Sequence, residues 1–230
     1  MATEILFSDL KAWLNAQPEN TASTPYEIII KNAPKGGGRA YTNAITRFVS
    51  IVGMEMSAGV TTIGQDAFLF CTNLISINIP EGVTSNETQA FQGCSNLISV
   101  RLPNSFTTLG SNAFSGCHKL RSINISFGVL SIGANAFRNC YDLNVIELPE
   151  TLTSIGSYAF GSCKLSLIYT YCPFSETLMQ SNSFWNTPSN TRLLIYPVYL
   201  SGWQSAILTN YGFASGVRAE SMYTKWIRIA

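Results

Sequence analysis

A fixed spacing of cysteines constrains the fold of this chain more than any other feature of its sequence. Five cysteines follow one another at intervals of 23 residues, and a sixth, Cys172, lies outside the series; the five are Cys71, Cys94, Cys117, Cys140 and Cys163. A self-similar period of this length is typical of repeat architectures, in which each unit packs only against its neighbours. We therefore expect an elongated array of units rather than one round core.

The sequence around these cysteines repeats without gaps in four consecutive blocks, 60–82, 83–105, 106–128 and 129–151. The fourth block reads VLSIGANAFRNCYDLNVIELPET, and a fifth, LTSIGSYAFGSCKLSLIYTY, is one residue shorter after its cysteine. Residues 51–59 supply half of a further block. These matches predict an array from Ile51 to Tyr171, an amino-terminal cap over residues 1–50, and a closing repeat with a carboxyl-terminal cap over residues 172–230.

Each block combines two kinds of apolar spacing. After the cysteine, Leu74, Ile77 and Ile79 indicate a short strand with these side chains inward, and a proline closes it. Before the cysteine, apolar residues spaced by three and four indicate a helical or irregular turn. Gly64 and its equivalents are expected where the chain turns sharply. Because one such unit cannot bury its apolar side alone, stacked units are expected to form a parallel sheet with strands about 4.8 Å apart.

Two blocks depart from the pattern. The second has Asn86 and Glu87 where the others have an apolar residue and glycine, and the third has Ser126 and Phe127 in place of proline and an acid or asparagine. We expect local distortion of these two coils. Asn86 also begins the triplet Asn-Glu-Thr, which matches a glycosylation sequon, but such triplets arise often by chance and we assign it no role.

The repeated phrase itself, LxxIxIP followed by VTxIGxxAFxxC, resembles the BspA-like, Treponema-type class of leucine-rich repeats. The flanks extend the resemblance, since LKAWLNAQPENTASTPYEIII is similar to the amino-terminal segment of treponemal members and LLIYPVYLSGWQSAI to a strand-proline-helix closure. The resemblance implies an α/β leucine-rich repeat solenoid with a concave parallel sheet, capped at both ends. It also implies a role in surface display, adhesion to host proteins or contact between cells.

The ends of a solenoid expose a layer of the core and need covering elements. Apolar spacing predicts a helix-strand-helix cap before the array and a strand, a helix and an apolar segment after it. The predicted segments are Ser8–Ala16, Tyr26–Lys31 and Tyr41–Phe48 at the amino end, and Thr191–Tyr196, Leu200–Leu208 and Tyr223–Ile229 at the carboxyl end.

The residues that usually carry chemistry do not form a catalytic pattern. Cysteines in a parallel ladder point the same way, which opposes disulfide geometry and tetrahedral zinc binding, so we expect buried, reduced thiols. His118 is the only histidine, and the residues at equivalent positions vary, which indicates an exposed turn. The motifs HExxH, GxSxG, CxxC and GxxxxGK[ST] are missing, and the glycines 36–38 are interpreted as a flexible turn.

The spacing of the carboxylates argues against a catalytic pair. Glu55 and Glu147 fall at equivalent strand positions four coils apart, which is about 19 Å at the usual strand spacing. Glycosidase carboxylates lie about 5 to 9.5 Å apart. The sequence therefore predicts a protein that is not an enzyme and that has no metal or cofactor.

Charge and hydropathy limit the classes of partner that we expect for this chain. The chain has 14 basic and 13 acidic residues, a net charge of +1, which provides no broad footprint for nucleic acid or anionic lipid. No apolar run reaches the length of a membrane-spanning helix, and the start MATEILFSDLKAWL lacks the pattern of a secretory signal. The resemblance implies an exported or surface-associated protein, while the missing signal pattern keeps a cytoplasmic or periplasmic location open.

Side chains that alternate with the inward residues are expected on the concave face of the sheet. We interpret this face as the binding surface, formed by Glu55, Asn78, Arg101, Asn124, Val145, Glu147, Leu167, Tyr169 and Tyr171. The last coils are less polar than the first. Val145, Leu167, Tyr169 and Tyr171 there form either a binding patch or a surface that the segment Pro173–Trp185 covers.

The functional hypothesis is a non-catalytic, adhesin-like module that recognises a host or bacterial protein through the concave face. Two alternatives stay open at this point. The first is a carrier that holds a small apolar ligand in a pocket at the carboxyl-terminal end of that face. The second is an intracellular scaffold, for which the reduced cysteines are suited. The chain is expected to be a monomer or a weak dimer, because the sheet edges are open to pairing.

Overall fold

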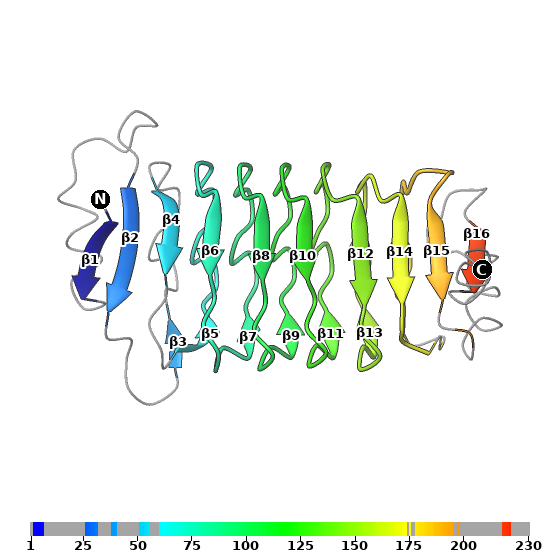
Figure 1. Ribbon diagram of the computed structural model, residues 1–230, viewed down its shortest axis with the longest axis horizontal. Helices are drawn as coiled ribbons and strands as arrows, with labels where there is room; N and C mark the ends of the chain where they lie inside the picture. Colours follow the sequence, from blue (N-terminus) through cyan, green and yellow to red (C-terminus); the bar gives the residue numbers. More distant parts are fainter. Residues whose placement is uncertain are drawn as a thin grey trace, which may run out of the picture.

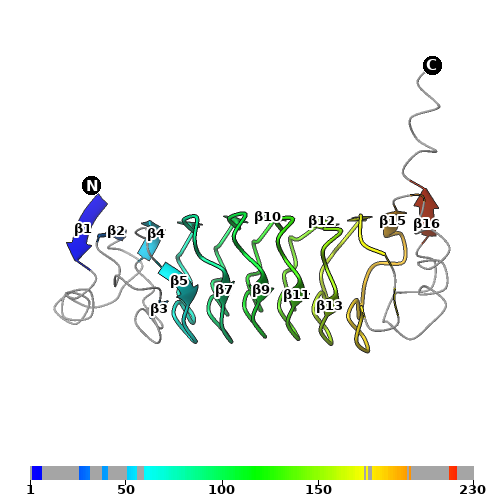
Figure 2. The same cartoon turned by 90° about the horizontal axis from the view of Figure 1, so that it is seen from below.

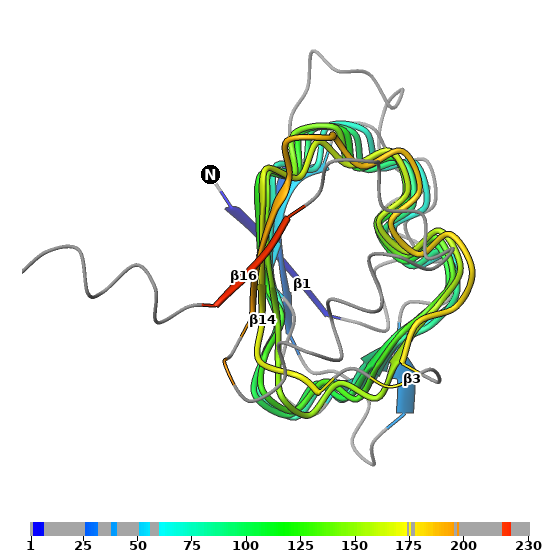
Figure 3. The same cartoon turned by 90° about the vertical axis from the view of Figure 1, so that its right-hand side faces the viewer.

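The protein is a stack of similar coils along one axis. The coils are seen side by side in Figure 1 and superposed end-on in Figure 3. The computed structural model describes residues 2–6, 26–31, 38–40, 51–55, 60–173, 175, 178–195, 197 and 218–221. Within these ranges the regular elements are short parallel strands joined by turns, and there is no α-helix. The predicted solenoid with repeats of 23 residues is confirmed, with little helix in it.

The strands that follow each cysteine lie side by side along one wall of the stack, together with further strands before and after the cysteine series, and this wall is here named the front wall (Figure 1). They form two hydrogen-bonded parallel sheets. The first contains β1 (Ala2–Leu6), β2 (Tyr26–Lys31), β4 (Ile51–Glu55), β6 (Ser76–Asn78), β8 (Ser99–Arg101) and β10 (Ser122–Asn124). The second contains β12 (Val145–Leu148), β14 (Leu167–Thr170), β15 (Arg192–Ile195) and β16 (Arg218–Ser221).

A second wall of very short strands, which the sequence analysis does not anticipate, forms the rear of the stack. It is one parallel sheet with the order β13, β11, β9, β7, β5, β3 (Figure 2). The strands are β3 (Gly38–Ala40), β5 (Val60–Ile63), β7 (Ser85–Asn86), β9 (Thr108–Leu109), β11 (Ser131–Ile132) and β13 (Ser154–Ile155). Each coil therefore contributes one strand to each wall, and the apolar side chains of both point into the space between them.

The segment between the rear strand and the cysteine is an irregular turn, which settles the two alternatives left by the sequence. Its amides bond to the next coil instead of along a helix: the N–H of Phe68 donates to the carbonyl of Ala90 at 2.7 Å, and Phe91 repeats this toward Ala113 at 2.8 Å. Two residues of each turn adopt a positive φ, as Asn112 (55°) and Gly116 (74°) do in the third coil. A left-handed residue at each end is incompatible with a continuing α-helix.

A column of phenylalanines fills the centre of the stack. Successive rings lie 4.9 to 5.6 Å apart and nearly parallel, and each is completely buried. The column contains Phe68, Phe91, Phe114, Phe137, Phe160 and Phe184. A short offset between identical rings is a consequence of the coil repeat, because each coil places its ring directly over the previous one.

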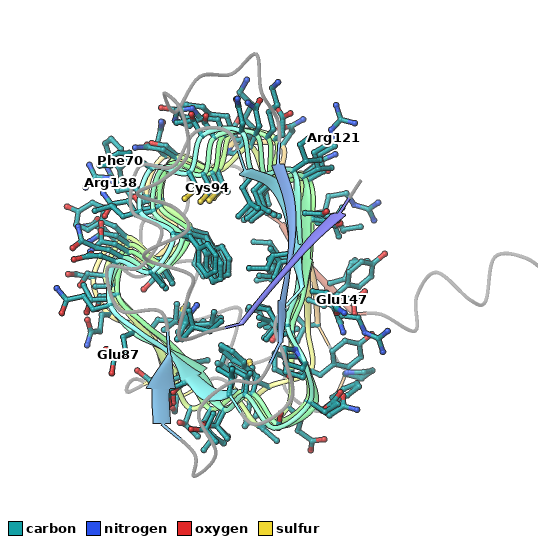
Figure 4. All side chains as sticks on the ribbon, turned by 90° about the vertical axis from the view of Figure 1, so that its left-hand side faces the viewer. Phe70, Glu87, Cys94, Arg121, Arg138 and Glu147 are labelled. Carbon is teal, nitrogen blue, oxygen red and sulfur yellow. The ribbon has the colours of Figure 1, made fainter. Side chains whose placement is uncertain are left out.

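The cysteines form a second column beside the rings, and Figure 4 shows the sulfur atoms gathered around Cys94 inside the coil. All six cysteines are free and buried, including Cys172, whose exposure the sequence could not indicate. The thiol of Cys94 donates to the carbonyl of Phe68 in the preceding coil at 3.1 Å, and Cys117 donates to Phe91 at 3.2 Å. Burial raises the pKa of the Cys94 thiol well above its usual value, so it stays protonated. The predicted role as reduced, structural thiols agrees with these contacts.

The glycines that recur in the repeat are needed for close packing between coils, and not for the sharp turn that the sequence suggested. Gly110, Gly133 and Gly156 have no positive φ; instead, the backbone of the neighbouring coil passes directly over them. A Cβ atom on Gly156 would lie 2.4 Å from the amide nitrogen of Ala134. The glycine therefore permits close stacking of coils rather than a sharp turn.

Both coils that depart from the repeat are irregular. In the second, the side chain of Asn86 points into the core, where its Oδ1 accepts from Gly110 at 2.7 Å and its Nδ2 has no hydrogen-bond partner. Asn86 is 2% exposed, so the sequon is closed to a glycosylating enzyme in the folded protein. In the third, the hydroxyl of Ser126 is buried without a partner, and the front sheet is interrupted directly afterwards, between β10 and β12.

The stack contains one more coil than the five cysteines indicate. Met179 forms a parallel bridge with Ile155, and the ring of Phe184 stacks on Phe160 at 5.0 Å. Thr187 stands where the other coils have cysteine, and its hydroxyl donates to the carbonyl of Phe184. Ser183, Phe184 and Thr187 stand where the other repeats have alanine, phenylalanine and cysteine, and this substituted pattern was the available signal in the sequence.

Of the predicted cap elements, the strand Tyr26–Lys31 is confirmed as β2 and the strand Thr191–Tyr196 as β15, one residue shorter at each end. The glycine run 36–38 is not simply a turn, because Gly38 begins β3. The predicted helices Ser8–Ala16, Tyr41–Phe48 and Leu200–Leu208 and the segment Tyr223–Ile229 lie outside the described residues. The division into two caps and an array stays a prediction.

Candidate binding face and groove

The outward side chains of the front wall form two rows across the strands, here named the front face. Strand pairing aligns Gly53, Ser76, Ser99 and Ser122 in one row and Glu55, Asn78, Arg101 and Asn124 in the other. From β6 to β10 these positions are exposed, while the residue between them in each strand is buried. The fold itself makes no use of these exposed side chains, so they are free to meet a partner.

Five of the predicted site residues lie together on this face, on four neighbouring strands. Asn78, Arg101, Asn124, Val145 and Glu147 are all exposed, and they come from β6, β8, β10 and β12. Glu55 lies in β4 in register with Asn78, although its side chain is outside the described part of the structure. The alternation of the sequence therefore located this part of the face correctly.

A groove of about 440 Å³ opens where the front sheet is interrupted, and we name it the break groove. Strands β10 and β12 are not hydrogen-bonded neighbours, whereas the rear strands β9, β11 and β13 of the same coils are continuously paired. The rings of Phe114 and Phe137 are also the most widely spaced of the column, at 5.6 Å. The break groove is lined by residues of β8, β10 and β12, namely Ser99, Val100, Arg101, Arg121, Ser122, Ile123, Asn124, Val145 and Glu147.

The break groove has side chains of both signs of charge in its lining. Arg101 is in register with Asn124, and Glu147 lies at the equivalent repeat position in β12, on the other side of the break. Arg121 directly precedes β10, and its Nε is 3.9 Å from an Oδ of Asp142. The Arg121 side chain remains 71% exposed, so this ion pair holds it only weakly. Figure 4 shows Arg121 and Glu147 on the same outer side of the coil, opposite Phe70 and Arg138.

Toward the carboxyl-terminal end, the front face becomes apolar and less accessible. Leu167, Tyr169 and Tyr171 are half-buried, and Leu194, in register with Tyr169, is only 5% exposed. Burial raises the pKa of Tyr171, and the nearby charge of Glu147 and the Tyr169 phenol raise it further. The four predicted residues thus do not form one exposed patch: Val145 belongs to the break groove, and the other three to the half-covered end.

The segment Pro173–Trp185 was one suggested cover for these residues, and its described part lies elsewhere. Leu178 and Met179 belong to the buried core, and Met179 pairs with Ile155 of the rear wall. Trp185 makes an edge contact with Tyr158 in the turn before the cysteine of the fifth coil. These residues extend the rear side of the stack and do not cover the front face.

Sequence reasoning missed Arg121 and a second groove beside it. Leu74 and Ile75 are consecutive apolar residues, but only Leu74 enters the core; Ile75 is 45% exposed, and its equivalent Ile98 is 40% exposed. Together they line a groove of about 280 Å³, named here the isoleucine groove, with Asn73, Asn96 and Lys119. Strand alternation was the available signal, because two adjacent residues of an extended chain cannot both point inward.

The other candidate groups have structural surroundings. His118 is exposed, as predicted, and its ring stacks on Tyr141 at 5.0 Å. Among the described residues, histidine, cysteine and acidic side chains do not gather into a group that could bind a metal ion. The same part of the chain contains no helix that is long and apolar enough to cross a membrane.

Comparison with known proteins supports the repeat architecture. No sequence among curated proteins matches this chain. The crystal structure of a leucine-rich repeat protein of T. pallidum superposes with a TM-score of 0.65 at 23% identity, over 84% of either chain. The pneumococcal vaccine antigen PcpA superposes with a TM-score of 0.54 at 14% identity, over 75% of this chain and 50% of PcpA. Both similarities concern the fold.

The sequence of the repeats gives the family directly. Six copies of the BspA type leucine rich repeat region match residues 43–191, which is well over half of the chain. The matched span reaches residue 191 and so includes the additional coil around Phe184. On this match and on the observed coils, the protein belongs to the BspA-type leucine-rich repeat family.

Proposed function

We propose that the protein is a non-catalytic binding module that recognises a protein partner through the front face. The observation that carries this proposal is the set of exposed polar and charged side chains on β6 to β12. Members of leucine-rich repeat families generally act as protein-interaction modules, which favours the same interpretation. An adhesin-like role outside the cell follows from the family resemblance and is part of the proposal.

Rigidity of the front wall supports binding of this kind. Within each of the two front sheets, parallel pairing ties a strand to its neighbours, and each coil is anchored by a buried phenylalanine and a buried leucine. Side chains on such a surface lose little backbone freedom when a partner binds, so the cost of ordering is small. Arg101 and Glu147, which line the same groove, fix the orientation of a partner through their opposite charges.

The proposal is tested by placing the same bulky residue on opposite walls. Ser122 is exposed at the centre of the front face, and Thr108 is exposed on the rear wall. Ser122→Tyr should abolish capture of the partner that the unmodified protein retains from host or bacterial extracts, while Thr108→Tyr should leave it unchanged. Quantitative mass spectrometry of the captured proteins provides the measurement, and equal capture by both variants would refute a front-face site.

The half-covered end of the face contributes in a separate way. Leu167→Ala combined with Tyr169→Ala removes apolar area from β14 without touching the phenylalanine column. We expect weaker binding of the captured partner with an unchanged circular dichroism spectrum. If both the affinity and the spectrum stay the same, the binding surface is confined to β6 through β12.

A further inference from the structure

Two grooves adjoin on the front wall, and together they describe the chemistry of a partner. The isoleucine groove and the break groove meet where Ile98 is followed by Ser99 in the chain. Lys119 lines the first groove and Arg121 the second, on either side of buried Leu120. An apolar depression therefore lies beside one that contains charged side chains, with two cations at the boundary.

Charge is distributed unevenly around this boundary. The cations Arg101, Lys119 and Arg121 belong to the second and third coils, and the acids Asp142 and Glu147 belong to the fourth. Arg101 makes no ion pair within the described part of the chain, and Arg121 has only its long contact with Asp142. The cationic side thus holds positive charge that its own fold leaves largely uncompensated.

The apolar side is equally unused. Ile75 and Ile98 expose 45% and 40% of their surface, one above the other in successive coils, although neighbouring Leu74 and Leu97 are fully buried. Two stacked aliphatic side chains that line a depression form a surface on which one further aliphatic or aromatic side chain can be buried. The amides of Asn73 and Asn96 bond to each other at its rim, so they do not fill it.

We propose that the two grooves bind one extended segment of a protein partner, with an apolar residue over Ile75 and Ile98 and acidic residues over Arg101 and Arg121. This inference rests on the proposed front-face function and specifies its partner as an acidic, amphipathic segment. Reaching from Ile98 to Arg101 and one coil further requires about four residues at roughly 3.3 Å each. The acids of the fourth coil limit the segment on that side, because like charges repel.

The test uses synthetic peptides, so it does not depend on finding the natural partner. The probe is acetyl-Leu-Leu-Ser-Glu-Glu-amide, and its matched controls replace both glutamates by lysine or both leucines by serine. Binding is followed by nuclear magnetic resonance of the arginine side-chain N–H groups in the full chain. We expect the probe to shift the signals of Arg101 and Arg121 but not of Arg138, which lies on the opposite side of the coil (Figure 4).

Substitutions then separate the two contributions. Arg101→Ala and Arg121→Ala should each weaken peptide binding about threefold, as expected for exposed ion pairs, and Ile98→Ser should weaken it by a similar factor. Lys164→Ala, an exposed lysine of the fifth coil, serves as the control and should have no effect. Added salt should reduce the arginine contribution and spare the isoleucine contribution.

Three outcomes would overturn the inference: no shift at the highest soluble concentration of the probe, equal binding of the lysine peptide, or equal binding of the peptide without leucine. The last result would mean that the grooves attract any anion. None of these results bears on whether Ser122→Tyr blocks capture of a partner, so failure of this inference and failure of the front-face proposal are distinguishable.

Discussion

At the scale of single residues, the neighbouring coil leaves no room for a side chain at the glycine before each turn. A Cβ on Gly133 would lie 2.6 Å from the amide nitrogen of Ser111, which is backbone and cannot move aside. Gly133→Ala should therefore lower the free energy of unfolding by about 1 to 3 kcal/mol. Gly161→Ala is the matched control, because its Cβ would be 3.2 Å from the nearest atom and a small adjustment suffices. Denaturant unfolding measures both, and equal losses would contradict this explanation.

Cys172 gives a prediction for pH. Burial raises the pKa of its thiol from 9.0 to about 11, so the folded protein keeps a proton that the unfolded chain releases above pH 9. The unfolded state then binds fewer protons, and stability falls as pH rises from 9 through 11. Cys172→Ala should flatten this decline by up to about 1.4 kcal/mol per pH unit. Denaturant unfolding across this pH range provides the measurement, and parallel curves for both proteins would contradict it.

At the scale of one element, strand β7 carries a defect that can be repaired. In other coils the amide after the rear strand donates to a backbone carbonyl, as Gly133 does to Leu109 at 2.8 Å. In β7 the side chain of Asn86 takes this role for Gly110, and its Nδ2 is buried without a partner. Asn86→Leu removes an unpaired polar group and restores an apolar core position.

We expect Asn86→Leu to raise the free energy of unfolding by about 1 to 2 kcal/mol, since an unpaired buried amide costs that much. Leu109→Asn, the reverse change at the equivalent position of the next coil, should lower it by more. Thermal and denaturant unfolding of the two variants decide the matter. A loss of stability in Asn86→Leu would show that the bond from Gly110 to the side chain is irreplaceable.

The elements also show which structure was predictable. Strand positions followed from the alternation of Ile77 and Ile79 with polar residues, because a half-buried strand must alternate. The rear strands did not, since two-residue strands such as Ser85–Asn86 are too short to alternate and are held by their neighbours in other coils. The same limit applies to the break between β10 and β12, which depends on how two coils pack.

At the scale of the molecule, the stack should tolerate removal of one whole coil. Deleting residues 83–105 joins Gly82 to Phe106, which is equivalent to Val83, and brings Phe114 over Phe68. The shortened chain should fold with the same circular dichroism signature and unfold cooperatively, because each coil contacts only its neighbours. Deletion of 83–94 removes half of that coil and should leave no folded product. A folded half-coil deletion would show that the repeat is not the packing unit.

The packing of complete coils also limits how much of the candidate site can be predicted from the sequence. Asn78, Arg101, Asn124 and Glu147 were located by counting alternate residues in equivalent strands. The break groove could not be found in this way, because it arises from the spacing of complete coils and not from the residues of any one of them. Repeats therefore predict the rows of a surface better than the depressions in it.

The direction of the hydrogen bonds in the cysteine column has a consequence for folding during synthesis. In the described part of the chain, each thiol that donates to a phenylalanine carbonyl does so to the preceding coil. Cys94 donates to Phe68, and Cys163 donates to Phe137. During translation the earlier coil emerges first, so its phenylalanine carbonyl has no thiol donor until the next coil has been synthesised. Each newly emerged coil completes the one before it, and the growing tip is always the least finished part of the molecule.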